Sequence, residues 1–565
     1  MKKLSFLLVF AIFCIIGTVA QEFTYGDFEY TINDDGNTVT LTGHVDGYAA
    51  SGELNIPTTA YYQGYEYTVT AIDSYAFSGC SELYGPLIIP NTVEIIGDFA
   101  FYRLYNLSSL TLSNSLRIIG NDAFDYCDFT GIITIPASVE SIGNNPFYSC
   151  YTIDGFSVES GNNHYDSRNN CNAIIETGSN TLIVGCKNST IPNTVTTIGE
   201  EAFAFCYSLN SIIIPSSVNS IENQAFCFCT GLNSINIPNS INSIEENPFM
   251  GCYNVSAITV DDDNAFFDSR NSCNAVINTN TNELIIGCQN TIIPDDITAI
   301  GEYAFFNCRN IAGELIIPNS VTAIGNYAFS NCPELNGQLN IPNSVTYIGK
   351  YAFYLCNGFN ELVLGESITT IDEMAFWHCT GFQGSLVIPN SVKIIGNSAF
   401  GSCTGFDGTL TLSSNLDTIQ PHAFTSCYGF TQIIPLSATP SHISIFSFDG
   451  LNNTLLVVPC GCINAYENSI WGSAFNNIMQ NCEAISETNE DVTYIYPNPT
   501  HGAIKIKAKN IHNVVIYNVL GEKIFESKVN GDTFEYGFEG YENGVYFIRI
   551  ERAKNVATQK VIVKH

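Results

Sequence analysis

The chain has 565 residues, with 20 Lys or Arg against 54 Asp or Glu, and its formal net charge is −34. Its body, residues 21–485, holds 8 basic and 44 acidic residues, a net of −36. A field of that sign disfavours binding to nucleic acid and to anionic lipid surfaces, and it helps to keep an apolar chain soluble. The charge does not select a partner.

The first twenty residues have the pattern of a secretory signal peptide. A charged start, residues 1–3, precedes the apolar run 4–20, and cleavage is expected between Ala20 and Gln21. Cys14 suggests a lipoprotein, but a bulky side chain stands before it where lipidation needs a small one. No later run approaches the ~20 apolar residues that span a membrane, so we predict no membrane span.

Residues 21–66 are expected to form an N-terminal β cap. Two alternating segments, residues 28–32 and 38–42, flank the turn sequence Asn33-Asp34-Asp35-Gly36, which predicts a hairpin. A solenoid needs such a cap because its first coil would otherwise expose the core.

Residues 67–459 repeat one pattern. Residues 315–332 read LIIPNSVTAIGNYAFSNC, residues 339–356 read LNIPNSVTYIGKYAFYLC, and residues 362–379 read LVLGESITTIDEMAFWHC. A period of 23 to 24 residues indicates a stacked architecture, in which each unit buries its apolar face only against its neighbours. We therefore predict a mostly β solenoid with one continuous core.

We expect about seventeen coils, most of 22 to 24 residues and three of 33. Two of the long ones contain similar inserts, near residues 159–190 and 261–292, offset by 102 residues. Each insert is expected to be a β-hairpin, with loops at residues 177–180 and 279–282. A C-terminal cap at 460–485 and a linker at 486–493 are expected to complete the order.

The cysteines fall into three groups. Twelve of the 21 occupy a Phe-x-x-Cys position, and Leu104 takes that position in one coil, which predicts a column of buried thiols rather than metal ligands. Opposed cysteines on antiparallel strands can bond in an oxidising compartment. The disulfide candidates are Cys171 with Cys186 and Cys273 with Cys288 in the inserts, and Cys460 with Cys482 in the C-terminal cap.

Catalytic motifs are absent from the sequence, and we predict no enzyme, cofactor or metal site. The eight histidines share no spacing, and there is no phosphate-binding loop, HExxH or GxSxG. A pair of catalytic carboxylates among the 54 acids is an alternative that the sequence cannot place. The candidate ligand contacts are tyrosines of the first long coil, namely Tyr61, Tyr62, Tyr65 and Tyr67.

The repeat (L/I)xIPxSVxxIGxxAFxxCxxL resembles the BspA-like leucine-rich repeats of bacterial surface proteins, over about residues 50–460. The inserts and the closing VPCG…W segment resemble variants within that family. The resemblance implies a surface protein, and several members act as adhesins for matrix proteins or other cells. Members share architecture more than ligand, so no partner carries over.

Residues 494–565 differ abruptly from the repeats and alternate as a small β-sandwich would. The set YPNPTxG, VxIYNVLGEKI and NGVYFIRI resembles the type A C-terminal sorting domain of the type IX secretion system. The motif positions are Tyr496, Pro497, Asn498, Pro499, Gly502, Asn518, Gly521, Gly544 and Tyr546. The resemblance implies handling by that secretion machinery, with the body then released or anchored at the surface.

Two functions follow from these expectations. The favoured one is a secreted or cell-surface binding scaffold, adhesin-like and non-enzymatic, for host or matrix proteins or other cells. The alternative is a glycan-binding accessory protein of a surface polysaccharide-degrading system, with exposed tyrosines stacking on sugars.

Overall fold

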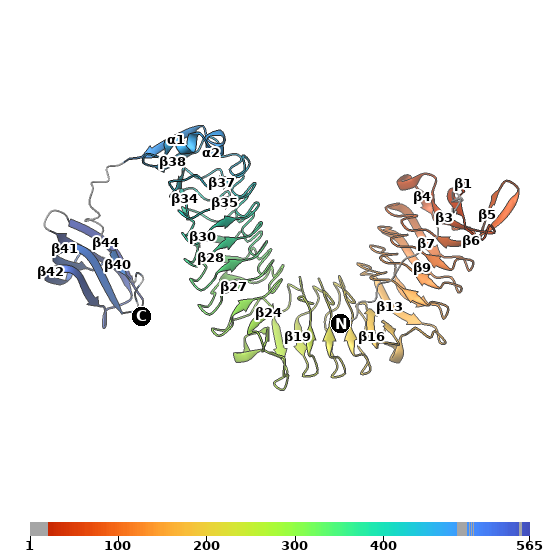
Figure 1. The fold of residues 1–565 in the computed structure, drawn as a ribbon. Coiled ribbons are helices and arrows are strands. Elements are labelled where there is room, and N and C mark those ends of the chain that lie inside the picture. The colour runs from red at the N-terminus through yellow and green to blue at the C-terminus, as the bar shows by residue number, and fades with distance from the viewer. Residues whose placement is uncertain are drawn as a thin grey trace, which may run out of the picture. The chain divides into compact units, whose positions relative to one another are not determined.

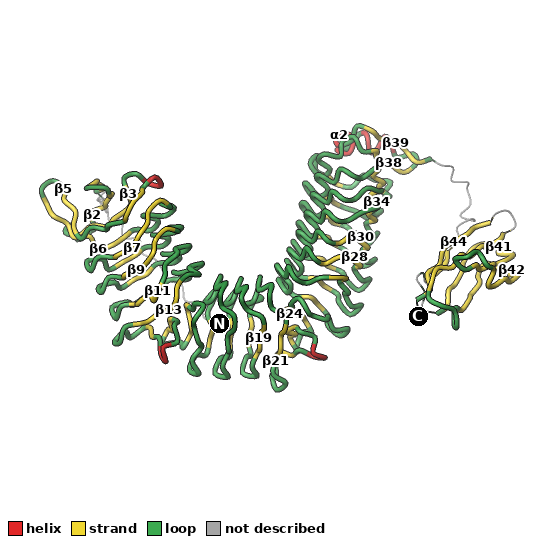
Figure 2. Tube along the Cα trace, turned by 180° about the vertical axis from the view of Figure 1, so that it is seen from behind, coloured by secondary structure: helices red, strands yellow, loops and turns green. Residues whose placement is uncertain are grey.

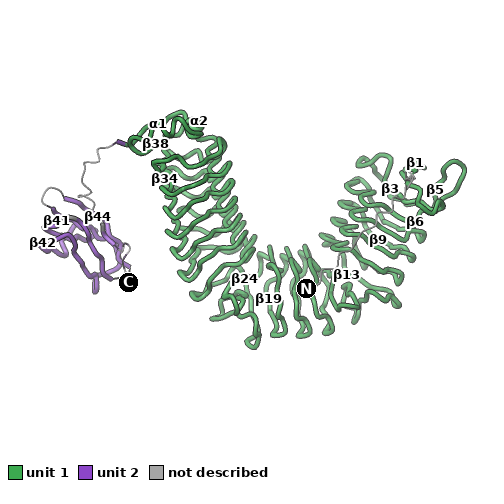
Figure 3. Tube along the Cα trace, viewed as in Figure 1, with its two compact units in different colours: residues 1–481 green, residues 482–565 purple. Residues whose placement is uncertain are grey.

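The computed structural model describes residues 21–482, 494–496, 498, 500, 502–552 and 556–564. These residues divide into two compact units, one ending at Asn481 and the other starting at Cys482 (Figure 3). The first is the predicted solenoid and the second is a small β domain (Figure 1). The predicted signal peptide and the predicted linker 486–493 lie outside the described residues.

A regular solenoid coil carries two short parallel strands joined by turns. In one regular coil, Leu339 and Ile341 are buried on either side of an exposed residue, as the alternation of a strand requires. Pro342 follows, where a strand loses its N–H donor. Ile348 and Phe353 then point into the same core. Figure 2 shows that turns make up most of each coil.

The strands before each Pro stack into what we call the Ile-Pro sheets. In pairing order these are β4 (Ser51–Glu53), β7 (Glu82–Ile88) and β9 (Asn106–Thr111); β11 (Gly131–Ile135) and β13 (Ile153–Val158); β19 (Ser234–Ile237) and β21 (Ala257–Val260); β26 (Gly313–Glu314), β28 (Leu335–Asn340) and β30 (Phe359–Val363); and β32 (Leu386–Val387), β34 (Thr409–Leu412), β36 (Gln432–Pro435), β38 (Leu455–Pro459) and β39 (Asn477–Asn481).

The strands after the Pro turn stack into the Thr-Ile sheets. These strands have two residues in the regular coils and are longer in the N-terminal cap and in the inserts. The first contains β1 (Glu22–Tyr25), β2 (Phe28–Ile32), β3 (Thr38–His44), β6 (Tyr65–Ile72), β8 (Ile95–Ile96), β10 (Ile118–Ile119) and β12 (Ser141–Ile142), with β5 (Thr59–Tyr62) on β6. The second contains β14 (Tyr165–Asp166), β15 (Ile174–Glu176), β16 (Thr181–Val184), β17 (Thr197–Ile198), β18 (Ser220–Ile221) and β20 (Ser243–Ile244). The third contains β22 (Phe267–Asp268), β23 (Ala275–Asn278), β24 (Glu283–Gly287), β25 (Ala299–Ile300), β27 (Ala323–Ile324), β29 (Tyr347–Ile348), β31 (Thr370–Ile371), β33 (Ile394–Ile395), β35 (Thr418–Ile419) and β37 (His442–Ile443).

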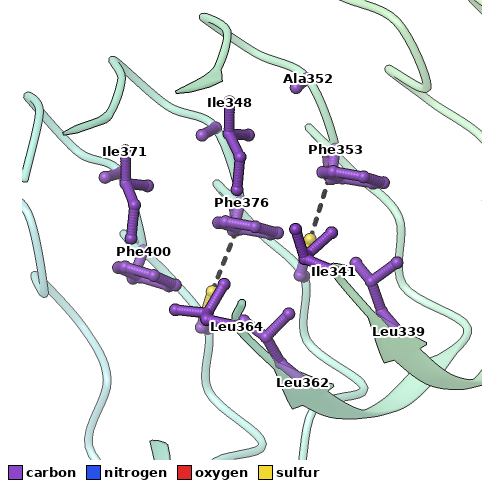
Figure 4. Close-up of a cluster of buried hydrophobic side chains, with 14 of the residues drawn as sticks. Leu339, Ile341, Ile348, Ala352, Phe353, Leu362, Leu364, Ile371, Phe376 and Phe400 are labelled. Carbon is purple, nitrogen blue, oxygen red and sulfur yellow. Dashed lines mark hydrogen bonds between the residues drawn. The ribbon is translucent and has the colours of Figure 1, made fainter. Parts of the chain in front are cut away.

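A column of stacked phenylalanines forms the centre of the core. Phe353, Phe376 and Phe400 lie nearly parallel, with ring centroids 5.3 and 5.2 Å apart (Figure 4). The predicted thiol column runs beside it, and its thiols are free and buried. Each thiol does more than fill space. The Sγ of Cys379 donates to the Phe353 carbonyl of the preceding coil at 3.0 Å, and most of the column repeats this bond.

The two inserts interrupt the phenylalanine column, so the expectation of one continuous core is wrong. Three hydrophobic clusters fill the solenoid, and the boundaries between them fall at the inserts. At each boundary an insert strand takes the place of a stacked Phe. Gly185 lies against the ring of Phe203, and Gly287 lies against the ring of Phe305, so closely that an added Cβ would overlap the ring.

The inserts are the expected hairpins, with loops at 177–180 and 279–282, and each gains a third strand, β14 or β22. The predicted disulfides within them are absent. Cys171, Cys186, Cys273 and Cys288 are free, buried thiols. The predicted register holds beside each loop, but a bulge shifts it by one residue farther along. The two cysteines that were predicted to face each other therefore lie in different core clusters, as Cys171 and Cys186 do.

Both ends of the solenoid are capped. At the N-terminus β1, β2 and β3 form an antiparallel meander, with the expected hairpin turn between β2 and β3. At the C-terminus α1 (Ile463–Glu467) and α2 (Ile470–Ala474) bury Tyr466 and Trp471. Short 3₁₀ turns complete the helical structure at η1 (Gly47–Ala49), η2 (Arg168–Asn170) and η3 (Arg270–Ser272). Cys460 and Cys482 are both disulfide-bonded, and they directly follow the register partners Pro459 and Asn481.

The C-terminal unit consists of β40 (Tyr494–Tyr496), β41 (Ala503–Tyr517), β42 (Lys523–Gly537), β43 (Gly544–Arg552) and β44 (Val556–Val563). The long strand β41 pairs with β40 through its first half and with β43 through its second, and β42 lines its other edge. The sheet therefore wraps around one core that includes Ile506, Ile548 and Val561. The predicted small β domain is confirmed.

Candidate functional site

A continuous series of aromatic rings lies on turns beside the buried phenylalanine column. From Tyr75 to Trp377, neighbouring rings have centroids 4.6 to 6.4 Å apart. We call this series the aromatic ladder. It consists of Tyr75, Phe99, Tyr102, Tyr126, Tyr148, Phe205, Phe228, Tyr303, Phe306, Tyr327, Tyr351, Tyr354 and Trp377.

The turn that presents the ladder holds its residues in an uncommon backbone conformation. Tyr303, Tyr327 and Tyr351 directly precede Ala-Phe pairs and have φ of 54°, 54° and 55°. A bulky residue at positive φ is a genuine outlier, because its Cβ crowds the following carbonyl. The conformation persists because each turn hydrogen-bonds to the next coil, as Phe329 N does to Ala352 O at 2.8 Å. The backbone therefore places these rings.

Within the ladder, the stack Tyr303–Tyr327–Tyr351 is the most regular part. Its centroids are 4.9 and 4.6 Å apart, and its planes are within 8° of parallel. Each half-buried ring covers a face of its neighbour, so edges and hydroxyl groups are what this part of the surface offers. Burial, with Tyr327 and Glu302 nearby, raises the pKa of Tyr303 to about 12. The hydroxyl is therefore protonated at neutral pH and can donate a hydrogen bond.

Trp377 ends the ladder. Its ring stacks on Tyr354 at 5.0 Å and on His378 at 5.0 Å. Carboxylates flank the neighbouring stack, where Glu373 pairs with Lys350 at 3.4 Å. Stacked aromatics with an acidic border are a surface that suits a protein partner with basic groups.

The ladder was not predicted from the sequence. Its signal is Tyr-Ala-Phe at residues 75–77, 303–305, 327–329 and 351–353, with a further aromatic directly after the Phe at positions 306 and 354. The Ala and Phe of each triplet define the repeat, whereas the residue before them varies between coils, so the tyrosines do not stand out in the pattern.

The four tyrosines predicted as ligand contacts lie on one hairpin but have different surroundings. β5 and β6 place Tyr62 opposite Tyr65, with Tyr61 opposite Glu66. Tyr62 and Tyr67 pack against the core and against Phe23, whose ring is 4.7 Å from that of Tyr62. Tyr61 and Tyr65 are 46% and 70% exposed. The hairpin thus offers two tyrosines to solvent rather than a row of four, and their role as ligand contacts stays a prediction.

A second feature that the sequence did not reveal is a group of perturbed carboxyls at the first insert. Asp125 is 5% exposed, and its Oδ1 has no hydrogen-bond partner among the described residues. Burial, with Asp122 nearby, raises the pKa of Asp125 to about 8. Burial, with Glu200 and Asp122 nearby, raises the pKa of Glu201 to about 7. Both carboxyls therefore hold protons near neutral pH, as a general acid must.

The cavity beside Glu201 is too small for a substrate. Asn145 Nδ2 donates to Glu201, and both border this cavity of about 20 Å³ together with Tyr148. Such a volume holds about one water molecule. In the part of the chain that the structure describes, no three His, Cys, Asp or Glu side chains converge as metal ligands. The same residues include no helix with the length and apolarity needed to cross a membrane.

The described sorting-motif residues hold turns and join strands. Asn498 Nδ2 donates to Lys560 O, and its Oδ1 accepts from Ile562 N, which ties the motif to β44. Asn518 Oδ1 accepts from two backbone N–H groups of the β41–β42 turn, where Gly521 has φ of 80°. Tyr546 is buried, and its hydroxyl donates to Glu542 O at 2.8 Å. Of the other motif positions, Tyr496 is exposed and Gly544 begins β43. The carbonyl of Gly502 accepts a hydrogen bond from Phe538 N. Pro497 and Pro499 lie outside the described residues.

Three solved structures of bacterial proteins are similar to this chain. A leucine-rich cell surface protein of Faecalibacterium prausnitzii is 25% identical, with 74% of this chain and 94% of that one covered and a TM-score of 0.43. The pneumococcal vaccine antigen PcpA is 17% identical, covering 82% and 99%, with a TM-score of 0.40. A leucine-rich repeat protein of Bacteroides ovatus is 21% identical, covering 81% and 99%, with a TM-score of 0.30.

A curated relative, an endo-acting ulvan lyase of Formosa agariphila, is 31% identical over 124 residues. The match covers 21% of this chain and spans 23% of the lyase. The family described as BspA type leucine rich repeat region matches residues 64–175, 183–284, 276–405 and 382–498. The secretion system C-terminal sorting domain matches residues 494–564. The chain therefore belongs to the BspA-type leucine-rich repeat family and ends in a secretion system C-terminal sorting domain.

Proposed function

We propose that the protein is an exported, non-enzymatic binding scaffold that recognises extracellular proteins, as an adhesin does, through the aromatic ladder. The sorting domain implies handling by the type IX secretion machinery and a final location at the cell surface or in the medium. The ligand is then a host or matrix protein or a protein on another cell. The perturbed carboxyls at the first insert do not favour an enzyme, because Asp125 is buried and the cavity beside Glu201 is only about 20 Å³.

The observation that carries the proposal is the continuity of the ladder across many coils. Aromatic side chains held by a rigid backbone lose little conformational entropy on binding, and they supply much of the energy at protein interfaces. The ladder rings are mostly half-buried, so their positions are set before any partner arrives. A flat partner surface can contact several coils at once.

The stacking geometry favours protein over sugar as the ligand of the ladder. Sugars stack on the open face of an aromatic ring, whereas Tyr303 and Tyr351 cover the two faces of Tyr327. The glycan alternative is supported at one other place. Tyr65, at the tip of the β5–β6 hairpin, is 70% exposed and contacts no other ring among the described residues.

The test compares two double variants of the chain from residue 21 to 565. Tyr327→Ser with Tyr351→Ser removes the centre of the ladder, and Tyr61→Ser with Tyr65→Ser removes the exposed tyrosines of the hairpin. Each variant and the wild type are immobilised and exposed to matrix glycoproteins and to polysaccharides, at low salt and at ~0.15 M, where exposed charges are screened beyond ~8 Å. Circular dichroism checks that each variant is folded.

We expect saturable protein binding that persists at the higher salt and falls at least tenfold in the ladder variant, while the hairpin variant binds as wild type does. Polysaccharide retention that is lost only in the hairpin variant would replace this proposal with the glycan alternative. Equal protein binding by all three chains would refute the role of the ladder.

A further inference from the structure

The Ile-Pro sheets break where the second insert ends. On the C-terminal side of β24, the segments Thr291–Ile293 and Leu315–Ile317 occupy the positions that form paired strands in regular coils, but neither is a strand. β26, which leads into the second segment, has only two residues. The next strands, β28 and β30, are of ordinary length.

The break leaves backbone groups unpaired. In regular coils the residue before Pro donates to the next coil, as Ile341 N does to Val363 O and Ile388 N does to Thr411 O, both at 2.9 Å. Among the described residues, Leu315–Ile317 make no such backbone bond to either neighbouring coil. Unpaired N–H and C=O groups along an extended apolar segment are a template for another strand.

A groove follows this break. It has a volume of about 430 Å³, and its walls come from the two segments and from the coil turn between them. Ile292 and Ile316 are 73% and 72% exposed at its rim, and Ile311 and Leu315 lie deeper. Exposed apolar side chains beside an open strand edge are unusual on a soluble protein, and they mark interaction sites.

The charge of the groove indicates what chemistry it accepts. Asp295 and Glu314 contribute to its lining, and no Lys or Arg does. The first insert offers a comparison within the chain, because Ile213 matches Ile316 in position and is 83% exposed. There Thr190 stands where the second insert has Ile292, two residues before Pro, so the opposite wall is less apolar.

We propose that this groove binds an extended peptide segment of a partner protein, which pairs as a strand with Leu315–Ile317. The segment has apolar side chains at alternate positions, which contact Ile292 and Ile316, and basic side chains at its ends, which meet Asp295 and Glu314. Main-chain bonds supply affinity in this mode, and the side-chain contacts supply specificity. The inference rests on the proposed role as a binding scaffold and adds the chemistry of one partner segment at a site distinct from the ladder.

The test uses the chain 21–565 and a fluorescein-labelled peptide, Lys-Thr-Val-Thr-Val-Thr-Lys, whose binding is followed by fluorescence anisotropy. Ile316→Lys removes the apolar side chain at the rim of the groove and puts a cation in its place. Ile88→Lys is the matched control, because Ile88 also lies two residues before Pro and is 58% exposed but belongs to β7, where it pairs with Thr111 of β9. A second peptide carries Glu in place of both Lys, and a third carries Pro at the central Thr.

We expect the wild type and Ile88→Lys to bind the first peptide equally and Ile316→Lys to bind at least tenfold more weakly. The Glu-ended and Pro-containing peptides should bind at least fivefold more weakly to the wild type. Absence of binding to the wild type, or equal binding by the two Lys variants, would overturn the proposal. So would a dimer of the wild type in sedimentation that Ile316→Lys abolishes, because the groove would then take a second copy of this chain.

The ladder variant with Tyr327→Ser and Tyr351→Ser separates the two proposals. If it binds the peptide as wild type does but has lost matrix protein, both stand. If the wild type binds matrix protein but not the peptide, the groove proposal fails and the scaffold function remains.

Discussion

The regular coils and the two insert junctions differ in how neighbouring coils of the solenoid pack against each other. In the coils around Phe353 and Phe376, identical side chains stack, thiols satisfy carbonyls, and β28 pairs with β30. At the junctions a glycine replaces the stacked Phe, carboxyls such as Asp125 are buried nearby, and the Ile-Pro sheets break. Repetition therefore builds stability, and its interruptions create the features that differ from the rest of the surface.

The largest effect is expected from breaking the phenylalanine column in a regular coil. Phe376 is fully buried between Phe353 and Phe400. Phe376→Ala should lower the free energy of unfolding by about 3–5 kcal/mol, because the removed ring leaves a cavity between coils that cannot collapse. Urea denaturation followed by circular dichroism measures this. The exposed Val387→Ala should change it by less than about 0.5 kcal/mol, and a similar loss in both would contradict the comparison.

The buried carboxyls at the first junction predict a pH dependence. Asp125 and Glu201 have pKa values raised to about 8 and about 7, so the folded chain holds protons that the unfolded chain releases above about pH 4. Stability contributed by these groups is therefore full below about pH 4 and is lost as the pH rises towards 8. Between pH 5 and pH 7 the two groups together predict a loss on the order of 4 kcal/mol before screening by solvent.

Asp125→Asn with Glu201→Gln should flatten this pH profile and stabilise the chain at pH 8. Arg103 and Asp122, whose charges act on Asp125, are unchanged in this variant. Urea midpoints measured from pH 5 to pH 8 compare the two chains. Parallel profiles would show that these carboxyls titrate normally.

The glycines that replace stacked Phe residues should tolerate no side chain. A Cβ at Gly185 would lie 2.2 Å from an atom of the buried Phe203 ring. Gly185→Ala should therefore cost about 1–3 kcal/mol of unfolding free energy through overpacking. Gly178→Ala, in the loop of the same hairpin with no atom within 4 Å, is the control and should be nearly neutral. Equal melting temperatures for the two variants would refute this account of the junction.

The smallest predicted effect concerns thiol reactivity. In the native chain the column thiols should resist labelling, because burial keeps them protonated and inaccessible, and burial raises the pKa of Cys356 to about 12. Cys462, which is only partly buried, should react first. In denaturant without reductant, mass spectrometry should count eighteen labelled thiols in the chain 21–565. Four fewer would mean that the hairpin cysteines are paired after all.

Several structural features could be predicted because they depend on local pattern alone. The repeat of Ile, Pro, Ala-Phe and Cys predicts stacking, since equivalent positions must meet when units repeat in register. The hairpin loops at residues 177–180 and 279–282 followed from two flanking alternations. The column of buried thiols followed from its tolerance of Leu104, although the hydrogen bond from each thiol did not.

Other features depend on relations that the pattern does not encode. In each insert a bulge shifts the register of the two hairpin strands by one residue, so the predicted cysteine partners are not opposite each other. A shift of one residue sends a side chain to the other face of a strand. Of the four tyrosines on the β5–β6 hairpin, only the packing of Phe23 decided which are covered.

The sequence by itself determined the class of fold, the order of its parts and the export domain, because each rests on residues within one repeat or one motif. The tertiary structure alone decided where the core divides, which tyrosines join into the ladder, and where the groove beside Ile316 opens. These features arise from contacts between residues a full coil or an insert apart, such as Tyr148 with Phe205 and Phe228 with Phe306. Their existence depends on how the inserts alter the stacking of neighbouring coils.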